Sequence, residues 1–380
     1  MATLIRGADV YAPEALGHQD ILIEGERISF IGEIDSADVA KLPTATIIDA
    51  HGLIATPGLI DPHVHISGGG GEGGFANRTP EISVADIVSS GVTTVVGCLG
   101  TDGVTRSIAG LLAKARGLEE EGISSFIFTG NYQLPAKTLT GSVTDDIVLI
   151  DKIIGAGEIA ISDSRSLQPN ISELADIVSQ CHVGGLLSNK AGVTHFHVGS
   201  HASRLAQLHR LIDDYPIPAC AIYATHVTRS IELLKDAVNL ASKGAFVDIT
   251  AADDTVSWVA RYAEGGGDLA QLTLSSDGNG SLPVFDAQGR LTGMEIARQS
   301  TLYKQMWACA EIPGMELSDA LALSTSNTAR ALNLERKGRL SAGCDADILL
   351  TDQRHKIQHA FARGEQTCDS GNVLIQGTFE

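Results

Sequence analysis

Two histidines, His63 and His65, have the spacing of a metal-binding pair. The apolar residues 53–60 are typical of a buried strand, and the segment DPHVH (61–65) follows directly. Side chains two residues apart on a strand point to the same side. At the carboxyl end of a buried strand, these two imidazoles would form half of a metal cage. A turn beside the glycine-rich residues 68–71 is the alternative interpretation, because a short motif is only a hypothesis.

Other residues able to bind metal or move protons occur near the ends of further predicted strands. They are Tyr132 after the third strand, Glu158, Asp163 and Arg165 on and after the fourth, His197 on the fifth, His226 and Arg229 after the sixth, and Asp277 after the eighth. Any one of these residues alone has a simpler interpretation. For example, His197 could be a core histidine, His226 a helix cap and Asp277 a turn residue. His195 shares the face of His197 by strand alternation and competes with it as a ligand. Their joint occurrence at one end of successive units indicates a single site.

Histidine nitrogen and carboxylate oxygen suit zinc and related divalent metals. Six side chains of these types are candidates: His63, His65, Glu158, His197, His226 and Asp277. This set is larger than one tetrahedral zinc needs. It suits two metals about 3.5–4 Å apart, which lower the pKa of water and polarise a carbonyl. The sequence therefore predicts a two-metal site with this chemistry.

The elements that would position these residues alternate between strand and helix. Eight buried-strand candidates occur at 59–65, 93–98, 125–129, 159–162, 194–198, 221–225, 245–250 and 272–275. Helix candidates lie between them, at 106–121, 171–181, 203–213, 230–242 and 254–264. Such alternation indicates a parallel sheet. It fits an α/β fold, a (β/α)₈ TIM-like barrel of the usual ~250 residues, with catalytic groups at the carboxyl ends of the strands. A doubly wound open sheet is the second possibility.

The two ends of the chain have a different pattern. Short β-rich runs with tight turns occur at 4–10 and 20–28, and similar runs occur at 347–351 and 372–377. A small sheet built from one end alone would be marginally stable. We therefore expect residues 1–57 and 338–380 to form one small β-sandwich domain, beside a catalytic barrel at 58–337.

Composition and charge limit the classes of partner. The 380-residue chain has a formal net charge of −19, which argues against nucleic acid, because phosphate binding needs clustered Lys and Arg. The six cysteines are scattered without C-x-x-C spacing, so neither a zinc ribbon nor a redox motif is indicated. The first residues do not resemble a signal peptide, and no apolar stretch approaches a membrane helix. We expect a cytoplasmic protein with free thiols and no membrane association.

Loop sequences along nearly the whole chain resemble those of a known family. They are GGGGE (68–72), RTPE (78–81), GVTTVVG (91–97), LGTD (99–102), TGSV (140–143), VGGLL (183–187) and LSSDGNGS (274–281). Together with the histidines and the aspartate, they resemble the amidohydrolase superfamily and, within it, the isoaspartyl (β-aspartyl) dipeptidase family. The resemblance implies hydrolysis of the isopeptide bond in small β-aspartyl dipeptides, and a homo-oligomer.

The resemblance also implies a catalytic centre. His63, His65 and Asp277 would hold one divalent metal, and His197 and His226 would hold the other, zinc being the expected metal. A hydroxide bridging the two metals would attack the amide carbon. Asp277 would act as general base and then as general acid.

The remaining implied roles concern the oxyanion and the substrate. Tyr132 would stabilise the developing oxyanion, and Glu72 would bind the substrate ammonium. The residues implied to bind the substrate carboxylates or to line the pocket are Arg165, Arg229, Ser281 and the backbones of Gly71 and Thr101. One acid and two guanidiniums complement the one ammonium and two carboxylates of a β-aspartyl dipeptide.

The chain departs from the family pattern at the bridging ligand. The family has a lysine carboxylated by CO₂ on the fourth strand, where this chain has Glu158. Glutamate already ends in a carboxylate, so we expect Glu158 to bridge two metals without CO₂. Its side chain is shorter, so the backbone would have to shift, which the GAG run at 155–157 would allow. The alternative is a glutamate near solvent at the start of the strand, with one occupied metal site.

Two other classes of function are possible. Another amidohydrolase, such as an N-acyl amino acid deacylase or a cyclic-amide hydrolase, is the alternative enzyme. An N-acyl amino acid has no free ammonium, so a site for it would not need Glu72. A non-catalytic assembly protein is the third class, and the complete set of metal-binding residues argues against it.

Overall fold

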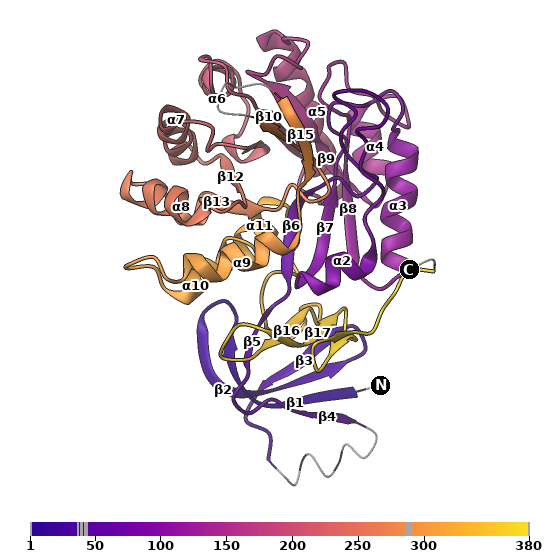
Figure 1. The fold of residues 1–380 in the computed structure, drawn as a ribbon, viewed down its shortest axis with the longest axis vertical. Helices are drawn as coiled ribbons and strands as arrows, with labels where there is room; N and C mark the ends of the chain where they lie inside the picture. The colour runs from indigo at the N-terminus through magenta and orange to yellow at the C-terminus, as the bar shows by residue number, and fades with distance from the viewer. Residues whose placement is uncertain (1, 36–37, 39–40, 42–44, 286–290, 379–380) are drawn as a thin grey trace.

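The structure is a computed structural model that describes residues 2–35, 38, 41, 45–285 and 291–378. Two large sheets lie one above the other in Figure 1, an eight-stranded sheet surrounded by helices and a nine-stranded sheet below it. The chain passes from the lower sheet to the upper one and returns at its end. Both ends of the chain therefore belong to the lower part of the molecule.

The upper sheet is parallel, and its strands are neighbours in chain order. They are β6 (Leu59–Val64), β7 (Val92–Gly97), β8 (Ser124–Thr129), β9 (Ile153–Ile161), β10 (Val193–Val198), β11 (Ile222–Thr225), β12 (Phe246–Thr250) and β13 (Leu272–Ser275). A parallel bridge between Val64 and Gly278 joins β6 to the segment after β13, so the sheet is a nearly closed barrel. The predicted (β/α)₈ barrel is confirmed, and the open doubly wound sheet is ruled out.

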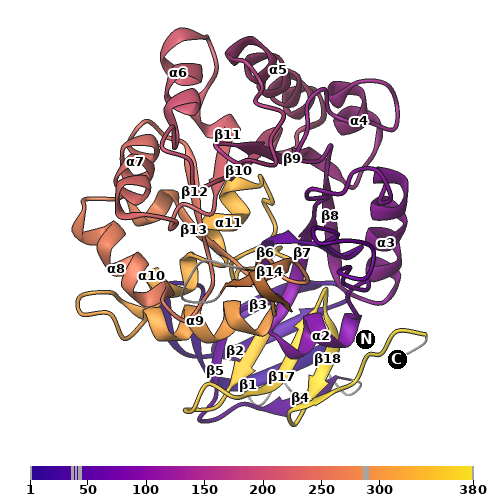
Figure 2. The ribbon, with the colours of Figure 1, turned by 45° about the horizontal axis from the view of Figure 1, so that its top comes forward.

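Helices surround the barrel, as Figure 2 shows. They are α2 (Val84–Ser89), α3 (Ile108–Glu120), α4 (Val143–Leu149), α5 (Ile171–Ser188), α6 (Ala206–Asp214), α7 (Ile231–Ser242), α8 (Thr255–Glu264), α9 (Ser300–Cys309), α10 (Leu317–Ala322) and α11 (Ser326–Ala331), with 3₁₀ turns η1 (Ala219–Ala221) and η2 (Leu269–Gln271). Several begin later than predicted, because Ser107 and Ser230 cap α3 and α7 from outside the helix. Among the described residues, no helix is long and apolar enough to cross a membrane.

Helix α5 extends to Ser188, beyond the end predicted from the sequence. Two glycines in its second half, which disfavour a helix in isolation, allow close packing instead. A Cβ added at Gly184 would lie 3.0 Å from Cβ of Ile147, and one added at Gly185 would lie 2.7 Å from Cα of Gly192. Tertiary contacts therefore decide the length of this helix.

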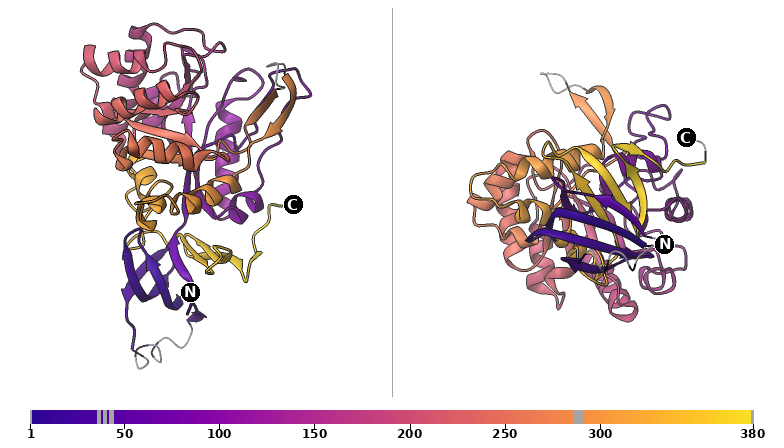
Figure 3. Two further views of the ribbon diagram at one scale, coloured as in Figure 1. Left: turned by 60° about the vertical axis from the view of Figure 1, so that its left-hand side comes forward. Right: turned by 90° about the horizontal axis from the view of Figure 1, so that it is seen from below.

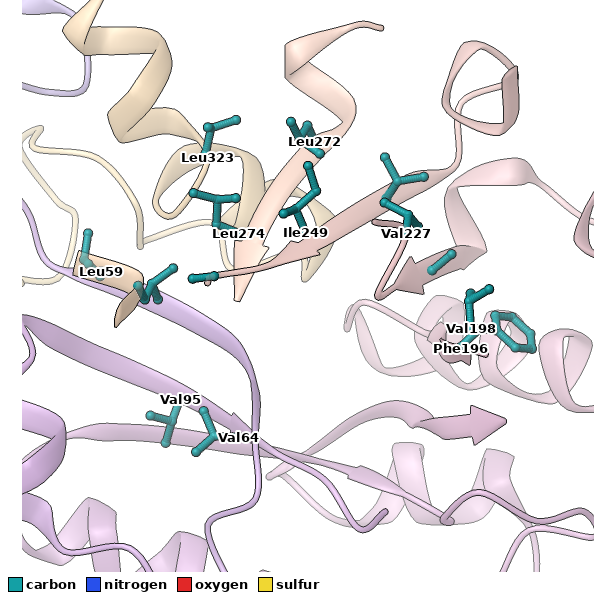
Figure 4. Packing of buried hydrophobic residues seen from close by; sticks show 14 of the residues in the cluster. Leu59, Val64, Val95, Phe196, Val198, Val227, Ile249, Leu272, Leu274 and Leu323 are labelled. Atoms are coloured by element: carbon teal, nitrogen blue, oxygen red, sulfur yellow. The ribbon is translucent and has the colours of Figure 1, made fainter. Parts of the chain in front are cut away.

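Alternate residues of the barrel strands belong to two hydrophobic clusters. Val95 of β7 belongs to a large cluster that also includes side chains of the surrounding helices, and Figure 4 shows part of it. Ile60 belongs to a smaller cluster with Val96 and Phe128. Because side chains alternate along a strand, these clusters pack against opposite faces of the sheet. The barrel is thus held from both sides, which fixes the strand ends.

The lower sheet contains strands from both ends of the chain. They are β1 (Ala2–Tyr11), β2 (Ala15–Glu24), β3 (Arg27–Gly32), β4 (Thr46–Asp49), β5 (Ile54–Pro57), β16 (Ile348–Thr351), β17 (Ile357–Ala362), β18 (Glu365–Asp369) and β19 (Asn372–Val373). On β5, Ala55 lies opposite both Val10 of β1 and Leu350 of β16. The right-hand view of Figure 3 shows the two sets of strands side by side. A second sheet made by both termini is confirmed, and the boundaries at 57/58 and 337/338 stay predictions.

One hairpin was not predicted. Strands β14 (Ser281–Phe285) and β15 (Leu291–Ile296) form an antiparallel pair after the last barrel strand. The pair projects from the barrel in the left-hand view of Figure 3. Its base contributes Leu282 and Met294 to the cavity at the barrel mouth.

Candidate metal centre and active site

A cavity of about 500 Å³ lies at the carboxyl ends of the barrel strands. Most of the site residues predicted from the sequence line it: His65, Glu72, Thr101, Tyr132, Glu158, Arg165, His197, His226, Arg229, Asp277 and Ser281. His63 is fully buried beside this cavity, next to Glu158. Gly71 lines a neighbouring cavity instead, which it shares with Glu72 and Thr101. The structure therefore gathers the whole predicted set in one region.

Glu158 lies inside β9, which begins earlier than predicted, and its side chain is 1% exposed. The alternative of a near-solvent glutamate at the strand start is wrong. Its Oε1 is 3.5 Å from Nε2 of His63 and 3.6 Å from Nε2 of His65. Its Oε2 is 3.1 Å from Nδ1 of His197 and 3.7 Å from Nε2 of His226. The two oxygens of one carboxylate thus face two different pairs of imidazoles.

A β-bulge positions this glutamate. Between two regular pairs of β9 and β10, Gly157 and Glu158 together lie opposite the single residue His195. An extra residue of this kind bends the strand and re-aims a side chain. A Cβ at Gly157 would lie 2.8 Å from the carbonyl oxygen of His195, so only glycine fits there without a shift. The bulge lies at the GAG run of residues 155–157, where the sequence led us to expect a backbone shift.

The carboxylate of Asp277 faces the same two imidazoles as Oε1 of Glu158, those of His63 and His65. Its Oδ1 is 3.5 Å from Nε2 of His63 and 3.2 Å from Nε2 of His65. Zinc–nitrogen distances of about 2.0–2.1 Å place tetrahedral ligands about 3.4 Å apart, close to these separations. Nε2 of His63 and Oδ1 of Asp277 are buried without a hydrogen-bond partner among the described residues. Converging donors that lack partners fit a bound metal ion.

A second group of donors lies on the other side of Glu158. Glu158, His197 and His226 each place a donor atom close enough to share one metal ion, and Nδ1 of His197 and Nε2 of His226 lie near Oε2 of Glu158. The other ring nitrogens have partners: Nε2 of His197 is 3.1 Å from Oδ2 of Asp163, and Nδ1 of His226 is 2.7 Å from Oγ1 of Thr250. Such outer contacts fix the tautomer and orientation of a metal-binding histidine.

His195, the competitor of His197, lies deeper in the barrel. Its Nε2 is 2.8 Å from Nδ1 of His63, and its ring stacks on Phe128. Burial and the charge of His63 hold the pKa of His195 well below its usual value. A neutral His195 can accept a hydrogen bond from Nδ1 of His63, which leaves Nε2 of His63 free to bind a metal.

The charge states of the two carboxylates and of His226 suit a cation. Burial alone would raise the pKa of Glu158, but the charge of His63 and hydrogen bonds from the other imidazoles hold it well below its usual value. The pKa of Asp277 is also lowered against the effect of burial, chiefly by the adjacent imidazole of His65. Burial and the charge of His197 lower the pKa of His226 to about 3. Ionised carboxylates and a neutral imidazole are the forms that bind metal.

Charged groups at the mouth of the cavity are paired with one another. Glu72 accepts hydrogen bonds from the hydroxyl of Thr101 at 2.7 Å, from Nη1 of Arg165 at 3.1 Å and from the hydroxyl of Ser281 at 3.4 Å. Arg165 also donates two hydrogen bonds of 2.9 Å to the carboxylate of Asp163. Asp163 also contacts His197 and therefore orients both Arg165 and that imidazole. Its sequence position alone did not reveal this role.

Tyr132 and Arg229 lie on either side of His197. The hydroxyl of Tyr132 is 2.9 Å from Nδ1 of His197. Burial and the charge of Glu158 raise the pKa of Tyr132 well above its usual value, so its hydroxyl stays protonated and can donate. Nε of Arg229 donates to the carbonyl of Val198 at 2.7 Å, and its Nη2 lies 3.5 Å from Nε2 of His197.

Cys98 is a residue near the metal-binding groups that the sequence interpretation missed. It follows the last residue of β7, and its Sγ lies within 4.8 Å of donor atoms of His63, His65 and Glu158. Burial raises the pKa of its thiol to about 11. The sequence contains a signal, because Cys98 is the last residue of the strand predicted at 93–98. The spacing between cysteines does not reveal it, since its neighbours come from other strands.

Comparison with known proteins agrees with this geometry. The amidohydrolase family model matches residues 54–379. Two solved structures of a β-aspartyl dipeptidase from Fervidobacterium islandicum AW-1 match over 98% of both chains. The one in complex with a β-Asp-Leu dipeptide has a TM-score of 0.92 and 44% identity, and the other has 0.90 and 42%. The dihydroorotase of Lactobacillus gasseri is 26% identical over 94% of this chain and 90% of its own length. The chain therefore belongs to the amidohydrolase family and resembles the β-aspartyl dipeptidases within it.

Proposed function

We propose that this protein hydrolyses the isopeptide bond of β-aspartyl dipeptides with the help of two divalent metals, zinc being the expected one. The proposal depends on the charged groups around a cavity with converging metal donors. These groups are the carboxylate of Glu72 and the guanidiniums of Arg165 and Arg229. They complement the one ammonium and two carboxylates of such a dipeptide. The β-Asp-Leu dipeptide bound to the Fervidobacterium relative supports the same substrate class.

Glu158 is the proposed bridge between the two metals, because its two oxygens face separate groups of donors. The other proposed ligands are His63, His65 and Asp277 for the first metal, and His197 and His226 for the second. When bound, the metals polarise the scissile carbonyl and lower the pKa of water.

Two protein groups act directly on the reacting atoms in this proposal. The carboxylate of Asp277 takes a proton from the attacking water and delivers it to the leaving amine, since its low pKa keeps it ionised beforehand. The Tyr132 hydroxyl, held protonated, donates a hydrogen bond to the oxyanion as it forms.

Substrate binding exchanges one ion pair for two. Without substrate, Glu72 and Arg165 neutralise each other at 3.1 Å. A zwitterionic dipeptide offers an ammonium to Glu72 and a carboxylate to Arg165, while Asp163 keeps the guanidinium oriented. A substrate without the ammonium would leave Glu72 unpaired, so the site should discriminate against it.

A panel of substrates tests the proposed reaction. The wild-type protein would be assayed against β-Asp-X, α-Asp-X, N-acyl amino acids and cyclic amides such as dihydroorotate, with metal content measured on the same samples. We expect hydrolysis of β-Asp-X together with two metals per chain. Cleavage of N-acyl or cyclic substrates but of no β-aspartyl dipeptide would overturn the proposal.

Glu72→Gln tests recognition of the ammonium. The variant should raise KM for β-Asp-Leu roughly 10- to 100-fold, because a hydrogen bond to a charged group contributes about 1.5–3 kcal/mol. Cleavage of N-acetylated β-Asp-Leu should change far less. Glu81→Gln is the control, since Glu81 is exposed. An unchanged ratio between the free and the acetylated substrate would contradict the role of Glu72.

Glu158→Ala and Glu158→Gln test the bridge. Both variants should lose at least one bound metal, measured by elemental analysis, because the carboxylate shared by the two groups is gone. Wild-type activity should not depend on added bicarbonate, since glutamate needs no CO₂. Two retained metals and full turnover in Glu158→Ala would show that Glu158 does not bridge.

We also propose a homo-oligomer in the cytoplasm, as the resemblance and the composition lead us to expect. Helix α5 presents an apolar face to solvent through Val183, Leu186 and Leu187, and Leu186 is 70% exposed. Contiguous apolar surface of this kind is common at interfaces between subunits. Light scattering coupled to gel filtration measures the mass of the assembly.

A further inference from the structure

Cys98 occupies a position that the proposed reaction does not use. It directly follows β7, the strand next to β6, and it is 0% exposed. The adjacent residue Gly97 pairs with Val64, which separates His63 from His65. Cys98 therefore lies at the same level of the barrel as these two histidines.

The Cys98 sulfur faces the first group of metal donors. Sγ, one ring nitrogen each of His63 and His65, and a carboxylate oxygen of Glu158 all lie within 4.8 Å of one another. The thiol makes a long hydrogen bond of 3.8 Å to the carbonyl of Val64, and its other polar neighbour is the imidazole of His63. Nε2 of His63 is fully buried and has no hydrogen-bond partner in the described part of the chain. Two imidazoles, a thiol and a carboxylate form a donor set that suits zinc.

We propose that Cys98 binds, as a thiolate, the metal held by His63 and His65. The inference rests on the proposed metal-dependent function and extends its set of ligands. On binding, the thiol releases its proton to solvent and a sulfur–metal bond forms, so the site gains one negative charge. Glu158 shares its negative charge between two metals, and the Cys98 thiolate adds negative charge at the metal held by His63 and His65. A sulfur ligand also favours zinc, cobalt or cadmium over magnesium and manganese.

Cobalt substitution provides a spectroscopic test. Cobalt-loaded wild-type protein should show the intense near-ultraviolet absorption of thiolate-to-cobalt charge transfer, and Cys98→Ser should lose it. Cys220→Ser is the matched control, because Cys220 is exposed and stands outside the donor groups found among the described residues. Absence of the band in wild type, or its persistence in Cys98→Ser, would overturn the proposal.

X-ray absorption on zinc-loaded wild-type protein tests the same bond without any variant. We expect a sulfur shell at about 2.3 Å besides nitrogen and oxygen at about 2.0–2.2 Å. Zinc content and hydrolysis of β-Asp-Leu, measured on the same sample, separate the two proposals. Bound zinc and turnover with only nitrogen and oxygen neighbours would overturn the role of Cys98 alone. A sample that binds no zinc yet cleaves the dipeptide would overturn the metal-dependent function as well.

Discussion

The hydroxyl of Tyr132 lies 2.9 Å from Nδ1 of His197, where it can reach an oxyanion beside the second metal group. Removing one such donor typically lowers kcat by ~100- to 1000-fold. We expect Tyr132→Phe to reduce kcat by this factor with little change in KM or metal content. Steady-state kinetics and elemental analysis measure these quantities, with Tyr215→Phe at the end of α6 as the control. Wild-type kcat in Tyr132→Phe would assign the oxyanion to another group.

Single residues also show what could be predicted of the site and what could not. His63 and His65 were predictable because alternation along a strand forces two residues two apart to one side. Asp163 and Cys98 carry no spacing motif, and their neighbours come from β10 and β6. Their proximity to the histidines results from the closed barrel, so only the three-dimensional structure reveals it.

At the scale of elements, the bulge in β9 is the feature on which the position of Glu158 depends. Gly157→Ala would place a methyl group 2.8 Å from the carbonyl oxygen of His195. Overpacking of this kind costs about 1–3 kcal/mol, and any relief of it moves the adjacent Glu158. We expect a lower free energy of unfolding together with reduced metal content, measured by urea denaturation and elemental analysis.

Gly117→Ala in α3 is the control for that substitution. An added Cβ at Gly117 meets open space in the described part of the chain. Replacing glycine by alanine inside a helix should stabilise the protein by about 0.5–1 kcal/mol without affecting metal content. Equal metal content in Gly157→Ala and Gly117→Ala would show that the bulge does not position the bridge.

The same strand explains why elements were predicted better than their ends. Period and composition identify β9 as a strand, but the bulge arises from its register with β10, which no local pattern encodes. Gly184 and Gly185 disfavour a helix locally, whereas packing against Ile147 and Gly192 keeps α5 intact. The sheet shared by both ends was predictable, because neither end alone has enough strands to be stable.

At the scale of the whole molecule, a buried ionic cluster joins the lower sheet to the barrel. Nζ of Lys337 lies 2.7 Å from the carboxylate of Asp347, just before β16. The carbonyl of Asp347 accepts a hydrogen bond from the backbone N–H of Gly58, where the chain passes from β5 to β6. Its carboxylate accepts another from the N–H of Arg363, whose guanidinium donates to the carbonyl of Glu119 in α3. The position of the lower sheet against the barrel therefore depends on this cluster.

Lys337→Met should destabilise the fold strongly. The Lys337 side chain is 6% exposed and pairs with both Asp345 and Asp347, so the substitution leaves the buried carboxylate of Asp347 without its cation. Breaking a buried pair in this way typically costs about 3–5 kcal/mol. Arg336→Met is the matched control, because Arg336 contacts the same Asp345 but is 59% exposed. An exposed pair contributes only about 0–1 kcal/mol.

The destabilisation by Lys337→Met should depend on pH if it results from loss of the Lys337 charge. Burial lowers the pKa of Lys337, but the charges of Asp347 and Asp345 outweigh this and raise it above the usual lysine value. A group whose folded-state pKa is raised contributes its full stability below the unfolded pKa, about 10.4 for lysine, and loses it as pH rises through the folded pKa. The free energy of unfolding of wild type relative to Lys337→Met should therefore be constant from about pH 7 to 9.5 and shrink above that. Urea denaturation of both proteins across this pH range measures the difference in unfolding free energy. If this difference stays constant up to the pH at which wild type itself unfolds, packing of the Lys337 side chain, not its charge, joins the two sheets.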